Sequence, residues 1–301
     1  MAVYPVSQPR SLVKFPEWPF GLNKSSGILK NIVSYLPLSA NAGGVDLAGG
    51  FHGTLVAGPV MGGTVLGSAL FLDNTDDHVS LANPTGLAFA APASVSFWFR
   101  GTTDDFNTAF SVSSSAATGN SFWIAVGNGT SGTLTNELIT LSRTIAGVTT
   151  FTIGYTTATR TEMFDGKPHH VAVVSNGSAW SIYLDGQSRT VTTGSGTNDG
   201  TFSNVASVDN ALVGALNNGG LGLRLFLAGN IWHVGVWNRA LSAGEVATLF
   251  RARSEHLAVP PGTLYFNVGA GPTGRIFTLT GGGGGLASRS RGLAASEMGG
   301  Y

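Results

Sequence analysis

The chain has 301 residues, a formal net charge of zero and no cysteine, and 43% of its residues are hydrophobic. This composition predicts a folded protein with a substantial core, because disordered chains lack the apolar side chains to form one. The absence of cysteine excludes disulfides and thiolate metal sites, and the balanced charge argues against a nucleic-acid-binding surface. No apolar run is long enough to span a bilayer, and no signal peptide is visible. We therefore expect neither nucleic acid nor membrane as a partner.

Residues 1–25 have the composition of an extended arm, because prolines at positions 5, 9, 16 and 19 are interspersed with aromatic residues. Residues 258–301 are predicted to form a second, glycine-rich arm, which includes the run Gly281–Gly285. Each arm holds three basic residues and one acidic residue. We predict that the arms bind neighbouring protein chains through the basic and aromatic residues Arg10, Phe15, Trp18, Phe20, Arg275, Arg289 and Arg291.

Between the arms, segments with apolar residues at every second position predict β-strands. Residues 94–102 form one such segment, with Val95, Phe97 and Phe99 on one face. Further strands are predicted at 122–126, 137–143 and 149–155, between loops rich in glycine, serine and threonine.

Residues 164–187 read as two strands joined by a two-residue hairpin at Asn176-Gly177, and Asp185-Gly186 predicts a second turn. The neighbouring His169 and His170 suggest a metal site at first sight. Adjacent residues of a strand point to opposite faces, so the two rings are poorly placed to bind one ion. We therefore predict that both histidines are structural.

A short helix is predicted after Ser242, because Glu245 follows three residues later and completes a capping box. The helical spacing of apolar residues continues to Leu257, and Pro260-Pro261 ends it. The helix is expected to bury Val246, Leu249 and Phe250 against the sheet.

Four segments, 52–81, 94–102, 164–187 and 227–250, resemble in order the strands of laminin-G-like, concanavalin A-like jelly rolls. The resemblance spans residues 26–257, although Pro168 stands where that family usually has tryptophan. It implies an all-β, antiparallel two-sheet jelly-roll sandwich (26–257) with one short C-terminal helix and extended N- and C-terminal arms (1–25 and 258–301).

The same family often binds calcium at the rim of the sandwich. The corresponding oxygen ligands here would be Asp73, Asn74, Asp76 and Asp77. However, Trp232-His233 replaces the acidic pair that relatives carry in the closing strand. Turn formation by these residues is therefore favoured over a calcium site, and no cofactor is expected.

A glycosidase of this fold would need two carboxylates on either side of the scissile bond. None of the glutamates outside the N-terminal arm has a second acid two or four positions later, and Asp76-Asp77 and Asp104-Asp105 are adjacent pairs. We therefore predict that the protein is not an enzyme.

Most aromatic residues are assigned to the core by alternation along their strands, namely Phe97, Phe99, Trp123, Trp180 and Trp237. Trp98 and Trp232 are out of phase with the neighbouring core positions. They could form a binding platform or a subunit contact, but packing beneath the helix is favoured.

Two functions from different classes remain open. The first is a non-enzymatic structural or interaction protein of a larger assembly. It would be a bacteriophage virion component (decoration, fibre or adhesion), a homo-oligomer with its arms on neighbouring chains. The alternative is a carbohydrate-binding, lectin-like module, extracellular or at a cell surface. It would bind glycans through rim loops such as 73–78, 103–108 or 216–224.

Overall fold

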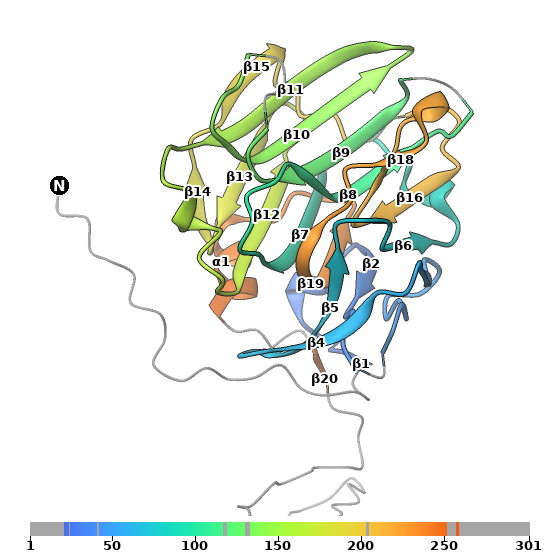
Figure 1. The fold of residues 1–301 in the computed structure, drawn as a ribbon, viewed down its shortest axis with the longest axis vertical. Helices are drawn as coiled ribbons and strands as arrows, with labels where there is room; N and C mark the ends of the chain where they lie inside the picture. Colours follow the sequence, from blue (N-terminus) through green and yellow to red (C-terminus); the bar gives the residue numbers. More distant parts are fainter. Residues whose placement is uncertain are drawn as a thin grey trace, which may run out of the picture. The chain divides into compact units, whose positions relative to one another are not determined.

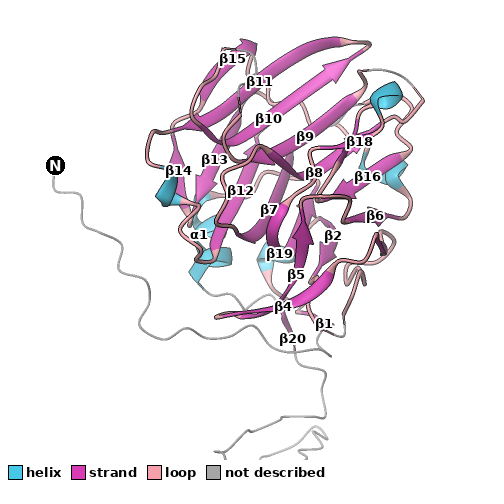
Figure 2. Cartoon of the chain, in the orientation of Figure 1, coloured by secondary structure: helices cyan, strands magenta, loops and turns pink. Residues whose placement is uncertain are grey.

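The computed structural model describes residues 21–23, 25–40, 42–116, 119–129, 133–202, 205–251 and 257–258. These residues form two eight-stranded antiparallel sheets and one α-helix (Figures 1 and 2). The predicted all-β, two-sheet jelly roll with one short helix is therefore confirmed. None of the helices in the described ranges has the length and apolar character needed to cross a membrane.

We call the two sheets sheet I and sheet II. Sheet I has the strand order β15 (Thr192–Gly196), β11 (Val148–Thr156), β10 (Glu137–Ile145), β9 (Ser121–Val126), β8 (Asn107–Ser113), β16 (Asn210–Val213), β6 (His78–Leu81) and β3 (Gly53–Val56). Sheet II has the order β14 (Gln187–Arg189), β13 (Trp180–Leu184), β12 (His169–Ser175), β7 (Ala93–Arg100), β19 (Ala228–Trp237), β5 (Gly67–Asp73) and β4 (Val60–Thr64), and β2 (Ile32–Leu36) also pairs with β19.

Smaller elements complete the described structure. They are the strand pairs β1 (Gly21–Leu22) with β20 (Leu257–Ala258) and β17 (Leu216–Asn217) with β18 (Leu223–Arg224), the 3₁₀ helices η1 (Gly27–Leu29), η2 (Pro84–Leu87), η3 (Arg160–Glu162) and η4 (Gly219–Leu221), and the helix α1 (Ala243–Arg251). Thus Gly21–Leu22, at the end of the predicted N-terminal arm, pairs with residues at the opposite end of the described chain. The seven arm residues predicted to bind neighbouring chains lie outside the described residues.

The core lies between the inner faces of the two sheets, and the alternation of apolar residues explains how it forms. In sheet II, Val171 pairs with Phe97 and Val173 with Val95, so one face of these strands is continuously apolar. In sheet I, Leu141 pairs with Ile124 on one side and Ile153 on the other. All of these side chains belong to one buried cluster. Each contributes about 1.5–3 kcal/mol of hydrophobic stabilisation.

The predicted hairpin at Asn176-Gly177 is present but its turn is displaced by one residue. Ser175 pairs with Trp180, and the backbone N–H of Asn176 donates to the carbonyl of Ala179 (3.2 Å). Gly177 has a positive φ of +91°, whereas Asn176 does not. The side-chain oxygen of Asn176 accepts the backbone N–H of Ala179 (2.9 Å). The predicted Asp185-Gly186 turn is confirmed, because Leu184 pairs with Gln187 and both turn residues have positive φ.

Helix α1 begins with the predicted capping box. The Ser242 hydroxyl accepts the N–H of Glu245 (3.2 Å), and the Glu245 carboxylate accepts the N–H of Ser242 (2.8 Å). Val246, Leu249 and Phe250 are buried as predicted. The prediction that the helical spacing reaches Leu257 is wrong, because this residue pairs with Leu22 as part of β20. Residues 252–256 lie outside the described ranges.

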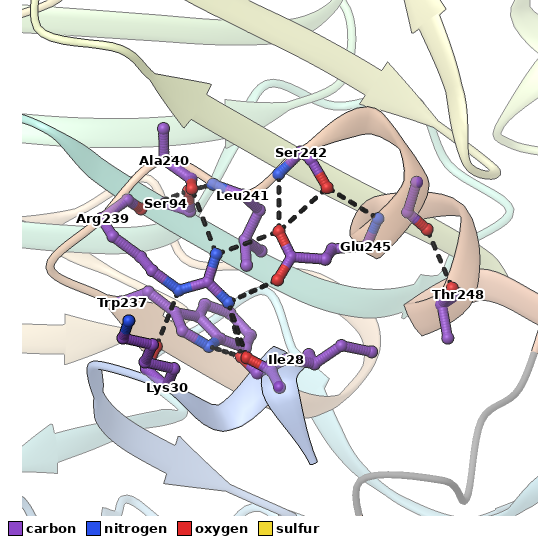
Figure 3. Close-up of polar contacts among 12 residues, drawn as sticks. Ile28, Lys30, Ser94, Trp237, Arg239, Ala240, Leu241, Ser242, Glu245 and Thr248 are labelled. Atoms are coloured by element: carbon purple, nitrogen blue, oxygen red, sulfur yellow. Dashed lines mark hydrogen bonds and ion pairs between the residues drawn. The ribbon is translucent and has the colours of Figure 1, made fainter.

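Arg239 connects the start of α1 to the N-terminal part of the fold (Figure 3). Its guanidinium donates to both carboxylate oxygens of Glu245 (2.7 and 3.0 Å) and to the carbonyls of Lys30 (2.7 Å) and Ile28 (3.0 Å). The indole N–H of Trp237 also donates to the Ile28 carbonyl (2.8 Å). One side chain therefore satisfies carbonyl groups around η1 and the carboxylate that caps α1.

Candidate functional site

Three segments that are far apart in the sequence meet at one rim of the sandwich. The Asn107 amide donates to the side-chain oxygen of Asn74 (2.8 Å) and to the carbonyl of Phe226 (2.5 Å). The backbone N–H of Asn74 donates to the carbonyl of Leu227 (3.1 Å). The predicted rim loops 73–78 and 103–108 therefore lie together. The third, 216–224, forms β17, η4 and β18, and residues 225–227, directly after it, make the contact.

A cavity of about 300 Å³ opens beside this rim, where β5, β7 and β19 lie side by side. We call it the rim cavity. It is lined by Phe71, Leu72, Asp73, Arg100, Gly101, Thr102, Thr103, Ala228, Gly229 and Asn230. Arg100 pairs with Asn230, and Asn230 with Phe71, so these three side chains project from the outer face of sheet II.

Glycine is required at position 229 of the cavity wall. Gly229 has a φ of +132°, and a Cβ atom there would lie 2.4 Å from the carbonyl oxygen of Arg100. Any larger residue would therefore clash with the backbone of β7. The close approach of β19 to β7 at this point places Arg100 next to Asn230.

The rim cavity combines one aromatic surface with several polar groups. Phe71 is 39% exposed, so part of its ring is accessible to a ligand. The Arg100 Nε donates to the carbonyl of Gly166 (2.7 Å), and no described carboxylate lies within ion-pair distance of its guanidinium. Thr102, Thr103 and Asp73 are exposed. The Phe71 ring can stack on an apolar ring face of a ligand, and the polar side chains can exchange hydrogen bonds with several of its hydroxyls at once.

The predicted calcium residues are only partly brought together. Carboxylate oxygens of Asp73, Asp76 and Asp77 lie within 4.8 Å of one another. Burial, and then the charge of Asp73, raise the pKa of the Asp77 carboxyl. The fourth residue, Asn74, uses its side-chain oxygen to accept the Asn107 amide. The preference for turn formation over a calcium site therefore stays a prediction.

Trp232 and His233 of the closing strand β19 are structural residues and not ion ligands, as an acidic pair at these positions could be. Trp232 is buried, and His233 adopts a φ of +50° at a bulge in β19. The Nδ1 atom of His233 lies 2.6 Å from the Tyr35 hydroxyl. Where relatives carry acids, this chain therefore has a buried indole and a hydrogen-bonded imidazole.

His169 and His170 have structural environments, as predicted. The ring of His169 lies between two carboxylates, with Nδ1 2.8 Å from Asp185 and Nε2 3.0 Å from Asp165. The ring of His170 is on the other face of the strand, 5.3 Å from the ring of Trp98. The two histidines therefore belong to separate clusters.

The aromatic predictions had mixed outcomes. The ring of Trp98 stacks with the rings of Trp232 and of Phe250 in α1, at centroid distances of 6.0 and 5.8 Å, which confirms packing beneath the helix. The core assignment of Trp123 is wrong, because Phe122 and Ile124 face the core and Trp123 lies on the outer face of sheet I. There it is partly exposed and forms an edge-to-face pair with Phe106 (5.7 Å).

Sequence reasoning did not identify Phe71, Arg100, Thr102 or Asn230 as site residues, whereas Thr103 lies in the predicted rim loop 103–108. Arg100 could have been found from the sequence. It lies two residues after Trp98, so both side chains project from the outer face of the same buried strand. A charged residue there, before a glycine, is unexpected in a strand that packs on both sides. Asn230 carries no comparable signal, because its neighbourhood depends on the pairing of β19 with both β5 and β7.

Among known proteins, similarity is found to solved structures and to one family model. A search of curated proteins finds no match. Domain 4 of AbnA, a GH43 extracellular arabinanase from Geobacillus stearothermophilus, was solved with arabinotriose and superposes with a TM-score of 0.50 at 17% identity. The match covers 73% of this chain and 98% of that one. The CBM40 of a Ruminococcus gnavus IT-sialidase gives a TM-score of 0.46 at 10% identity, with coverages of 64% and 96%.

A model of the concanavalin A-like lectin/glucanases superfamily matches residues 73–247. The matched region begins at Asp73 in the rim cavity and ends within α1, so it includes most strands of both sheets. The chain therefore belongs to the concanavalin A-like lectin/glucanases superfamily.

Proposed function

We propose that this protein is a non-catalytic carbohydrate-binding module whose ligand lies in the rim cavity. The observation that carries the proposal is the combination, in one cavity, of the exposed Phe71 ring with Arg100, Asn230 and exposed threonine hydroxyls. Sugars present an apolar ring face and a set of hydroxyls, and this combination offers a partner for each. The arabinanase domain of the same fold, solved with arabinotriose, supports a glycan as the ligand class.

The residues of the rim cavity suit recognition better than hydrolysis. Asp73 is the only carboxylate among the residues that line it. Glycoside hydrolysis in its usual form requires two carboxyl groups on either side of the scissile bond. We therefore expect ligand to be bound and released unchanged.

The test is binding of the full chain to a broad glycan array, followed by calorimetry in solution with each glycan that binds. Arabino-oligosaccharides and sialyllactose belong on the array. Phe71→Ala should weaken binding at least tenfold, which corresponds to about 1.4 kcal/mol. Val148→Ala is the matched control, because Val148 is also an exposed apolar residue but lies on β11 in sheet I.

Two outcomes would contradict the proposal. The first is no binding to any glycan of the array. The second is binding that Trp123→Ala abolishes and Phe71→Ala does not change, because the site would then be the Phe106–Trp123 pair on sheet I.

The assembly hypothesis depends on residues of the two arms, which lie outside the described ranges. Incorporation into a bacteriophage virion, and a virion location, stay predictions. Deletion of 1–25 or of 258–301 should abolish incorporation into such a particle. Normal incorporation of both truncated proteins would contradict this hypothesis without affecting the glycan proposal.

A further inference from the structure

Strand β4 forms one edge of sheet II, and its outer side has no strand partner among the described residues. It pairs only with β5, from Val60 with Phe71 to Thr64 with Gly67. No backbone hydrogen bond from described residues reaches the other side of β4. An open edge presents unpaired N–H and C=O groups, which another strand can satisfy.

The β4–β5 hairpin also gathers exposed apolar side chains. Of the seven large apolar residues exposed in the described ranges, four lie on it, namely Val60, Met61, Val65 and Phe71. Val60 is 57% and Met61 37% exposed. Residues 60–72 contain no charged residue. Proteins usually protect such edges with lysine, proline or a bulge, and β4 has none of these between Val60 and Thr64.

We propose that β4 is the interface of a homodimer, in which β4 of one chain pairs antiparallel with β4 of a second copy. The strand is uncharged, so two identical strands meet without the repulsion that like charges would cause. A strand with charged residues would instead place those charges against Val60 and Met61.

The sequence of β4 also fits its own copy in shape. In an antiparallel pair with its two-fold axis at Gly62, Met61 lies opposite Gly63 of the second copy, and Val60 lies opposite Thr64. Each larger side chain then faces a smaller residue, and the contact is the same from both sides, as a two-fold interface requires. The pairing joins two copies of sheet II into one continuous sheet.

The dimer contact lies along β4, whereas Arg100 lies on β7. Asn230 and Phe71 lie between them, since a Cβ atom at Gly62 would be 3.0 Å from the Asn230 amide nitrogen and Phe71 pairs with Val60. The dimer would place two rim cavities on the outer face of one joined sheet, and a ligand with repeated units could then bind both. The interface does not depend on glycan binding, so it is tested without any ligand.

The first experiment measures the mass of the full chain in solution by light scattering or sedimentation over a range of concentrations. We expect a dimer of twice the chain mass of 30.9 kDa. Met61→Lys should raise the dimer dissociation constant at least tenfold, because it places a charge in each apolar contact. Val148→Lys is the matched control, since Val148 is 67% exposed on another sheet. Thermal unfolding verifies that both variants are folded.

A second experiment tests the register directly and does not depend on Met61→Lys being folded. The chain has no cysteine, so the double variant Met61→Cys/Gly63→Cys introduces the only thiols. Mild oxidation should give a covalent dimer, because residue 61 of one chain faces residue 63 of the other. A monomer at every concentration overturns the proposal, whatever else covers the edge. A dimer that persists unchanged in Met61→Lys and does not cross-link overturns the assignment to β4.

Discussion

His169 lies with its Nδ1 atom 2.8 Å from a carboxylate oxygen of Asp185, and the other oxygen of Asp185 accepts the backbone N–H of His170 (2.9 Å). Asp185 occupies the turn between β13 and β14, so one carboxylate joins that turn to the start of β12. The opposite ring nitrogen of His169 contacts Asp165 (3.0 Å). With a carboxylate at each nitrogen, the ring is stabilised as a doubly protonated cation.

These contacts set a pH range in which the cluster stabilises the fold. Burial opposes the charge of His169, but hydrogen bonds to Asp185 and then Asp165 raise its pKa above the ordinary 6.5. Its contribution is complete below pH 6.5 and is lost as pH rises through the raised pKa. Burial also opposes the charge of Asp165, but bonds from Lys167 and His169 lower its pKa from 3.8 to about 2. That contribution is present above pH 3.8 and is lost as pH falls toward 2.

We expect His169→Gln to lower the free energy of unfolding by about 1–3 kcal/mol near pH 5 and by less near pH 8, because the charged hydrogen bonds are removed. Urea denaturation across this range measures both values. His52→Gln is the control, because the His52 ring accepts the backbone N–H of Asp46 and has no carboxylate partner among the described residues. Equal losses for His169→Gln at both pH values would contradict the charged state.

A second prediction concerns Arg239, which donates to Glu245 and to carbonyls around η1. Arg239→Lys should lower the free energy of unfolding by about 1–2 kcal/mol, because an ammonium group cannot make the paired bonds of a guanidinium. Arg224→Lys, at an exposed position, should have no effect.

The same contact predicts acid sensitivity. The hydrogen bond from Arg239 is the main cause that lowers the pKa of Glu245 from 4.5 to about 2. The resulting stability is present above pH 4.5 and is lost as pH falls toward 2. Arg239→Lys should therefore flatten this acid limb of the stability profile. An unchanged profile would show that Arg239 is not the main partner of Glu245.

A third prediction tests the aromatic stack beneath α1. Phe250→Ala should lower the free energy of unfolding by about 3–4 kcal/mol, because the buried ring fills space against Trp98. Water would then reach Trp98, so tryptophan fluorescence should shift to longer wavelength. Arg251→Ala, at the exposed neighbouring position, is the control. A stable Phe250→Ala protein with unchanged fluorescence would contradict the packing role of the helix.

Local sequence patterns predicted the strands and turns because their causes are local. The Asp185-Gly186 turn depends on two residues that tolerate positive φ, and both are adjacent in the chain. The apolar residues of 122–126 likewise predicted β9, but the assignment of Trp123 to the core was wrong. Phe122, Trp123 and Ile124 are all apolar, and only the packing of sheet I on sheet II decides that Trp123 faces outward.

The candidate site could not be predicted because its causes are distant in sequence. Arg100 is positioned by the carbonyl of Gly166, and Asn74 by Asn107 and Leu227. No periodicity relates these positions, and each contact depends on the order of strands in the sheets. The loop that holds Asp73, Asp76 and Asp77, which we call the acidic loop, was identified because these residues are close neighbours in the chain. The same closeness is typical of an ordinary turn.

The last prediction decides between these two roles of the acidic loop. Burial, and then Asp73, raise the pKa of Asp77 above its ordinary 3.8, so the folded protein carries this charge at a cost once the pH exceeds that pKa. Asp77→Asn should therefore raise the melting midpoint near pH 7 in the presence of a chelator. Asp105→Asn, in another exposed rim loop, is the control. If the loop is only a turn, calcium leaves the wild-type midpoint unchanged. If calcium raises the midpoint of the wild type but not of Asp77→Asn, the three carboxylates that lie within 4.8 Å of one another bind the ion.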